Sequence, residues 1–191
     1  MSELYTALPY SIEYKGRTYR LRPFFDVVLE VLDTLNRKDL TGESVIEYCL
    51  WLLVDEKRYP LDGEFLDEIL TLLVKRGKSD HPRSIDMRQD AELIYSAFRQ
   101  AYNIDLHKEQ LHWSEFVSLL GGLPSDTRLM EVVQIRTRPV PKPTKYNADE
   151  IRELMRLKAI YRIKLTDEEA DEQYRAGLNR LAQNLINQAI Q

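Results

Sequence analysis

Apolar residues recur at intervals of three and four along six separate segments between residues 24 and 133. That spacing places them on one face of an α-helix, whereas a half-buried strand would need strict alternation. The clearest stripe is in the fourth segment and consists of Ala91, Ile94, Tyr95, Phe98, Ala101 and Tyr102. A chain with six such stripes is constrained to a mainly α fold in which each helix buries one face.

Only residues 10–22 alternate in the manner of strands. Lys15 and Gly16 lie in the middle of this stretch, and glycine supplies the positive φ that a tight hairpin turn needs. Pro23 follows and suits a first helical position, because its missing N–H would have no partner there in any case. The sequence therefore predicts an N-terminal β-hairpin that leads into a helical core.

The expected helices of this core are bounded by turn residues and caps. Gly63 precedes the third helix and Gly77 ends it, because glycine readily adopts the backbone conformation at which helices stop. Ser125 or Asp126 can cap the sixth helix. The other four helices are expected over residues 24–35, 44–55, 91–102 and 113–120.

The helical pattern stops after residue 136. Three prolines, Pro139, Pro141 and Pro143, alternate with other residues, and this spacing favours extended polyproline II over helix. The same stretch carries basic side chains and no acidic ones. We therefore expect a core of residues 1–136 followed by a basic, proline-rich linker of residues 137–146.

Two further helices are predicted in a C-terminal pair over residues 147–191. Asn147 and Thr166 each precede an acidic residue at the spacing of a capping box. The second helix carries a narrow apolar seam, which suits a helical hairpin or a coiled-coil partner, with packing against its own core as the alternative. The residues of this seam are the predicted protein-binding residues: Tyr174, Leu178, Leu181 and Leu185.

Composition narrows the class of protein. Apolar residues make up 43% of the chain and the net charge is −4, which favours a folded domain over disorder and disfavours a general nucleic-acid binder. The single cysteine, Cys49, lies in an apolar run and is expected to be a small core residue. No stretch approaches the ~20 apolar residues that cross a membrane, and no signal peptide is evident. We expect a protein of the cytoplasm.

Candidate catalytic and metal-binding residues are few. The possible metal ligands are concentrated in one stretch of the chain and are Asp105, His107, Glu109, His112 and Glu115. The two histidines are five residues apart, so they would not share a helix face. We expect Asp105 to cap the turn before the fifth helix and His112 to pack or hydrogen-bond locally. The acidic pair Asp86 and Asp90 fits a helix start. The sequence predicts no enzyme, no bound metal and no cofactor.

Two alternatives remain open. The basic side chains of Arg136, Arg138, Lys142 and Lys145 could follow phosphates, so a nucleic-acid-binding regulator is a weaker hypothesis. The aromatic side chains of the fourth and fifth helices are predicted to form the core, with an exposed partner groove as the alternative.

Four motifs follow one another in the second half of the core: I-Y-x-A-F-x-Q-x-Y-x-I-D-L at residues 94–106, L-H-W-x-x-F-x-x-L at residues 111–119, G-L-P-x-D-T at residues 122–127, and I-R at residues 135–136. In order and spacing they resemble the bacteriophage gene product fifteen family, which comprises short tail-region proteins of phages and prophages of Gram-positive bacteria. The N-terminal third matches more loosely, and the C-terminal third carries no motif of the family.

The resemblance implies a non-enzymatic function in tail assembly. Family members are encoded between the major tail protein and the tape-measure protein, the position of tail assembly chaperones. The partners implied in this way are the tape-measure protein, the major tail protein and an upstream tail chaperone. This chain would be the product of the second of two such chaperone genes. The alternative is a structural component of the virion tail. Self-association stays open, and the family motifs name no catalytic residues.

Overall fold

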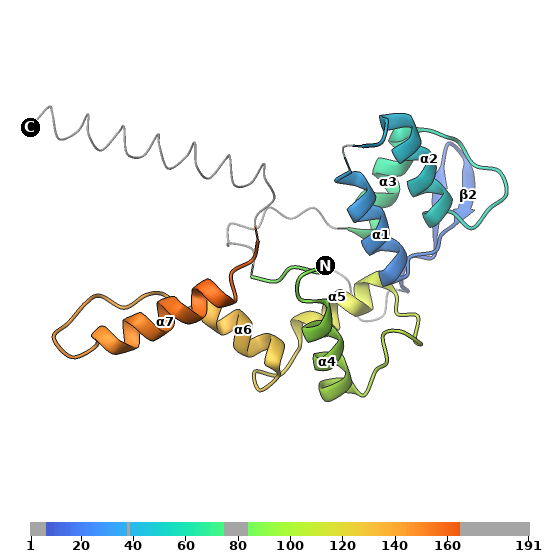
Figure 1. The fold of residues 1–191 in the computed structure, drawn as a ribbon. Coiled ribbons are helices and arrows are strands. Elements are labelled where there is room, and N and C mark those ends of the chain that lie inside the picture. The colour runs from blue at the N-terminus through green and yellow to red at the C-terminus, as the bar shows by residue number, and fades with distance from the viewer. Residues whose placement is uncertain (1–6, 38, 75–83, 165–191) are drawn as a thin grey trace, which may run out of the picture. The chain divides into compact units, whose positions relative to one another are not determined.

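The computed structural model describes residues 7–37, 39–74 and 84–164, and these are mainly helical, with 53% of them in helices. Contacts divide the chain into two units. The hairpin unit comprises residues 1–83 and 90–131, and the α7 unit comprises residues 84–89 and 132–191. The predicted mainly α class with an N-terminal hairpin is confirmed (Figure 1).

The hairpin unit begins with strands β1 (Ser11–Tyr14) and β2 (Arg17–Arg20), which pair antiparallel with Ser11 opposite Arg20 and Tyr14 opposite Arg17. The turn between them has φ +48° at Lys15 and +75° at Gly16. Two consecutive positive φ values are the signature of a type I′ turn, whose twist matches that of the flanking strands. The predicted turn is therefore confirmed.

Three helices follow the hairpin: α1 (Phe25–Leu35), α2 (Gly42–Leu53) and α3 (Gly63–Leu73). The helix predicted to start at Pro23 starts two residues later, because Phe24 is extended and both residues bond to another segment. The Pro23 carbonyl accepts a hydrogen bond from Trp113 N at 2.7 Å, and Phe24 bridges His112. The predicted helix end at Gly77 lies outside the described residues.

Asp62 joins the hairpin to α3. Its side chain caps α3 by accepting from Glu64 N at 3.0 Å, and it also accepts from Tyr14 Oη at 2.6 Å and Lys15 Nζ at 3.0 Å. The hydrogen bond from Tyr14, then that from Lys15, lower the pKa of Asp62 to about 2. A single carboxylate thus fixes the hairpin turn against the start of a helix 47 residues away.

The segment after β2 is held on two sides by backbone hydrogen bonds. Arg22 N donates to Leu53 O at 2.8 Å and Asp55 N donates to Arg20 O at 2.9 Å. Farther along, Phe25 N donates to Leu111 O at 3.0 Å. These bonds attach the end of the hairpin to the end of α2 and to the loop before α5.

Helices α4 (Ala91–Tyr102) and α5 (Trp113–Gly121) complete the aromatic core of this unit. Phe98 is fully buried and stacks on Phe116 with ring centroids 5.3 Å apart, and Phe116 in turn stacks on Phe25 at 4.8 Å. The predicted aromatic core is correct at these positions. Val117, an apolar residue of the predicted fifth helix, is 43% exposed, because neighbouring residues of a helix point in different directions and Phe116 is the one that faces the core.

The α7 unit is built on polar contacts. It contains α7 (Ala148–Ile160) and the last part of α6 (Arg128–Thr137), which the division crosses. Arg136 donates from Nε to Tyr161 O at 2.6 Å and from Nη1 to Ser84 O at 3.0 Å. Lys158 Nζ donates to Arg136 O at 2.6 Å. Gln89 adds two hydrogen bonds, one to Arg162 O and one from Lys164 N.

Two predicted caps are wrong. Thr127, rather than Ser125 or Asp126, supplies the oxygen at the start of α6, where its Oγ1 accepts from Met130 N at 3.4 Å. Asn147 precedes α7 as predicted, but its Oδ1 accepts from Thr144 N in the preceding turn and makes no cap bond. Glu150 pairs instead with Arg138 at 2.6 Å, so no capping box forms.

The proline-rich stretch between α6 and α7 is largely exposed and has no regular secondary structure. The first helix of the predicted C-terminal pair is α7, whereas the second lies outside the described residues. The predicted domain boundaries at residues 136 and 146 stay a prediction.

Candidate functional site

The predicted protein-binding seam, consisting of Tyr174, Leu178, Leu181 and Leu185, lies outside the described residues. The seam stays a prediction. The other candidate residues predicted from the sequence lie within the described part of the chain. The same part contains a pocket that the sequence did not indicate.

His112 is a structural residue at the start of α5. Its Nδ1 accepts from Ser114 N at 3.0 Å, so Nε2 carries the proton and faces Pro9 O at 3.3 Å. Glu115 accepts from His112 N at 3.0 Å and completes a capping box. The ring is fully buried with both nitrogens engaged. The prediction that His112 hydrogen-bonds locally is therefore correct, and these hydrogen bonds cap the N-terminus of α5.

Asp105 holds the turn before α5, as predicted. Its Oδ1 accepts from His107 N at 3.2 Å and from Tyr95 Oη at 3.4 Å. Its Oδ2 lies 3.4 Å from Lys108 Nζ. Burial raises the pKa of Asp105, but the His107 N–H and Lys108 outweigh it and leave this pKa below its ordinary value. Among the described residues, no three His, Cys, Asp or Glu side chains are grouped so that they could hold a metal ion.

Asp86 and Asp90 differ in their surroundings. Asp86 Oδ1 accepts from Arg88 N and Gln89 N in the turn before α4, while Asp90 is buried at the N-terminus of that helix. Cys49 is fully buried, and burial raises the pKa of its thiol to about 11. A thiol with so high a pKa is largely protonated at neutral pH and is a poor nucleophile, which fits the expected core position.

In the basic stretch around the proline-rich segment, two side chains make internal contacts and two are exposed to solvent. Arg136 bonds two carbonyl oxygens and Arg138 pairs with Glu150, so both guanidinium groups serve the α7 unit. Lys142 and Lys145 are exposed. Two of the four side chains that could follow phosphates are therefore committed to internal contacts.

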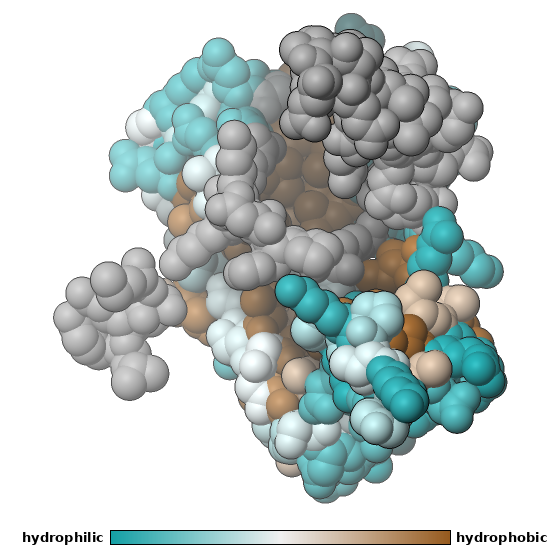
Figure 2. Space-filling view, turned by 90° about the vertical axis from the view of Figure 1, so that its left-hand side faces the viewer, coloured by the Kyte–Doolittle hydropathy of each residue, from teal (hydrophilic) through white to brown (hydrophobic). Residues whose placement is uncertain are grey.

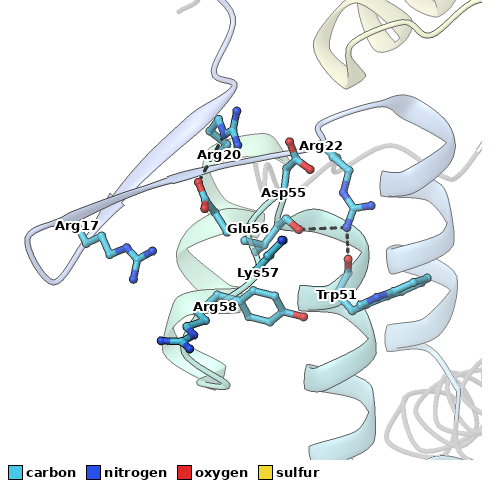
Figure 3. A pocket seen from close by; sticks show the side chains of 10 residues that line it. Arg17, Arg20, Arg22, Trp51, Asp55, Glu56, Lys57 and Arg58 are labelled. Carbon is cyan, nitrogen blue, oxygen red and sulfur yellow. Dashed lines mark hydrogen bonds and ion pairs between the residues drawn. The ribbon is translucent and has the colours of Figure 1, made fainter.

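A pocket of about 620 Å³ lies in the hairpin unit between β2 and the segment after α2 (Figure 3). Sequence reasoning missed it, because its basic residues come from two segments separated by more than 30 positions. The only local signal is the adjacent pair Lys57 and Arg58 after an apolar helix. The ten lining residues are Arg17, Arg20, Arg22, Trp51, Val54, Asp55, Glu56, Lys57, Arg58 and Tyr59.

Two of the pocket's arginines are engaged. Arg22 donates through Nη2 to Trp51 O and, at 3.1 Å, to Val54 O, and it thereby satisfies carbonyls at the end of α2. Arg20 lies 3.5 Å from Glu56. In Figure 3, Arg22 and Trp51 lie on one side of the pocket and Arg17 and Arg58 on the other.

Large apolar side chains also reach the surface. Figure 2 shows hydrophobic surface on one face of the molecule beside hydrophilic surface. Trp51 is 56% exposed and stacks on Tyr48 with ring centroids 5.8 Å apart. Scattered exposure of this kind is common, but a tryptophan beside a charged pocket is typical of interfaces. Other large apolar side chains that are exposed include Leu61, Val117, Met155 and Ile160.

The fold and these sites define a mainly helical protein built on an N-terminal β-hairpin. The chain belongs to the bacteriophage Gp15 protein family, whose sequence model matches residues 4–163. It is therefore a phage protein, and the resemblance of its motifs to this family is confirmed. Family membership points to a structural or tail-region protein with other phage proteins as partners.

No curated protein matches the chain, and no solved structure matches it. Among the described residues, no helix has the length and apolar character that crossing a membrane requires.

Proposed function

We propose that this protein is a non-enzymatic chaperone or adaptor of phage tail assembly. The observation that carries the proposal is the match of the family model to residues 4–163, which covers the hairpin, the aromatic core and α7. The tape-measure protein, the major tail protein and an upstream tail chaperone are the proposed partners, because family members are encoded beside the first two.

The chemistry of the described residues supports a binding role. His112 is a helix cap with both ring nitrogens engaged, and Cys49 is a buried thiol with a raised pKa. Neither is available as a base or nucleophile. The proposed client-binding surface is the C-terminal seam around Leu178 and Leu181, since apolar anchors at helical spacing are how grooves and helices recognise one another.

The experiment is coexpression of the full-length chain with the tape-measure protein of the same phage, followed by affinity capture. Leu178→Asp with Leu181→Asp should sharply reduce capture, because charges at the seam oppose apolar contact. The matched control, Asn179→Asp with Gln183→Glu, adds the same charge outside the seam and should capture as the wild type does. Equal capture by both variants would refute the seam as the binding surface.

The alternative, a structural component of the tail, is separated by a second measurement. A chaperone should be absent from purified, mature particles, whereas a tail component should be present in a fixed ratio to the major tail protein. Quantitative mass spectrometry of particles distinguishes the two. Failure of the wild-type chain to bind any of the three proposed partners would overturn the tail-assembly proposal itself.

A further inference from the structure

We infer that the pocket between β2 and the segment after α2 binds an acidic segment of a partner protein. The segment would place carboxylates against Arg17, Lys57 and Arg58 and an apolar side chain against Trp51. This surface is independent of the C-terminal seam, and the inference does not require the proposed function to hold.

The pocket has a fixed frame. Backbone hydrogen bonds from Arg22 N to Leu53 O and from Asp55 N to Arg20 O join its two walls. The Arg22 guanidinium ties the same walls together through Trp51 O and Val54 O. The backbone that carries the side chains of the pocket is thus fixed before a ligand arrives, which lowers part of the entropy cost of binding.

Charge in the pocket opposes that of the whole chain. Five of the lining residues are basic and two are acidic, while the chain carries a net charge of −4. Arg17, Lys57 and Arg58 are exposed, and within the described residues none of them forms an ion pair. Arg17 instead lies over the Tyr19 ring at 5.0 Å. Three cations that line one pocket are thus available for carboxylates.

The shape and composition favour a protein segment over a nucleic acid. A volume of about 620 Å³ accommodates a few side chains, whereas a nucleic-acid strand follows a longer basic groove. A peptide can direct its own backbone N–H groups at Asp55 and Glu56, whereas a run of phosphates offers these two carboxylates no donor. Exposed Trp51 offers an apolar surface beside the cations, the combination that interface anchors use.

The test measures fluorescence anisotropy of a labelled peptide of Asp and Glu with one central Phe, titrated with the full-length protein. A peptide with Lys in place of the acids and an oligothymidylate are the comparison ligands. The pocket variant is Arg17→Glu, Lys57→Glu and Arg58→Glu. The matched control carries the same change in charge at exposed positions outside the pocket: Lys142→Glu, Lys145→Glu and Arg152→Glu.

We expect the wild type and the control to bind the acidic peptide alike, and the pocket variant to bind it about tenfold or more weakly, with affinity falling as salt rises. Equal binding by the two variants would overturn the inference, as would tighter binding of the lysine peptide. Binding of oligothymidylate that exceeds peptide binding and is lost in the pocket variant would also overturn it, in favour of a nucleic acid.

A second measurement keeps the inference falsifiable if the triple variant is unstable. Trp51 lies at the pocket and Trp113 is buried, so Trp113→Phe leaves Trp51 as the single tryptophan reporter. Its emission should shift to shorter wavelength when the acidic peptide binds. No shift at saturating peptide would contradict the proposed placement beside Trp51.

Discussion

The hairpin unit and the α7 unit are stabilised by different kinds of interaction. In the hairpin unit, rings such as Phe98 and Phe116 are fully buried and stacked. In the described part of the α7 unit, the buried apolar side chains are only Val132 and Leu154. Hydrogen bonds from Arg136 connect α6 to the residues at Ser84 and Tyr161.

The difference teaches where each unit is sensitive. Burial of apolar area is non-directional and large, so a ring lost from the hairpin unit leaves a cavity that its neighbours cannot fill. A hydrogen bond replaces one made to water, so its net contribution is about 1 kcal/mol. The hairpin unit should therefore be sensitive to changes of volume, and the α7 unit to loss of a few donors.

The largest expected effect tests the buried rings. Phe98→Ala should lower the free energy of unfolding by about 3–5 kcal/mol, because the ring is fully buried against Phe116. Urea unfolding monitored by circular dichroism measures it. Val117→Ala, at an exposed position of the neighbouring helix, is the control and should cost less than about 1 kcal/mol. Similar losses for the two would contradict the assigned core.

A smaller effect is expected at the cap of α5. His112→Ala should cost about 2–3 kcal/mol, because it removes the cap and leaves Pro9 O and Ser114 N without their partner. His112→Asn keeps a capping oxygen and should recover part of the loss, while His107→Ala at an exposed site should cost little. Zinc bound in stoichiometric amount by the wild type and lost in His112→Ala would instead make this a metal site.

In the α7 unit, Arg136→Ala should cost about 1–2 kcal/mol of local stability, through loss of the hydrogen bonds to Ser84 O and Tyr161 O. Hydrogen exchange should be faster in α7 and unchanged in α4. Arg156→Ala is the matched control, because the ion pair that it breaks within the described residues is the exposed one with Glu153 inside α7. Equal loss of protection in α4 would mean that the two units unfold as one.

The smallest effect depends on pH. The pKa of Asp62 is lowered to about 2 when folded, from about 3.9 in an unfolded chain, so its contribution is complete above about pH 4 and is lost as pH falls toward 2. Asp62→Asn keeps a capping side chain but removes the charge. The difference in denaturation midpoint between wild type and variant should shrink from pH 6 to pH 2. A constant difference would show that the charge is not involved.

Local patterns were sufficient for the secondary structure and much of the core. The stripe through Ile94 and Phe98 predicted α4 and its buried face, and Lys15–Gly16 predicted a turn whose φ values are positive. Failures came where a residue's partner is distant in the sequence. Pro23 lies before α1, where its carbonyl accepts from Trp113 N, and Glu150 pairs with Arg138 in place of its expected cap.

The same reason explains the candidate sites. The motifs of residues 94–136 indicated the family, because each motif is a continuous stretch of the sequence, and the family model matches residues 4–163. The sequence did not predict the basic pocket, since Arg17 and Arg58 come to line one pocket only when Leu21, which follows β2, pairs with Val54, which follows α2. Helical periodicity, turn chemistry and family motifs are short-range properties, so the sequence by itself determined them. The choice of capping residues, the contacts of Asp62 and the pocket depend on contacts between segments that are distant in the sequence. Only the tertiary structure decided them.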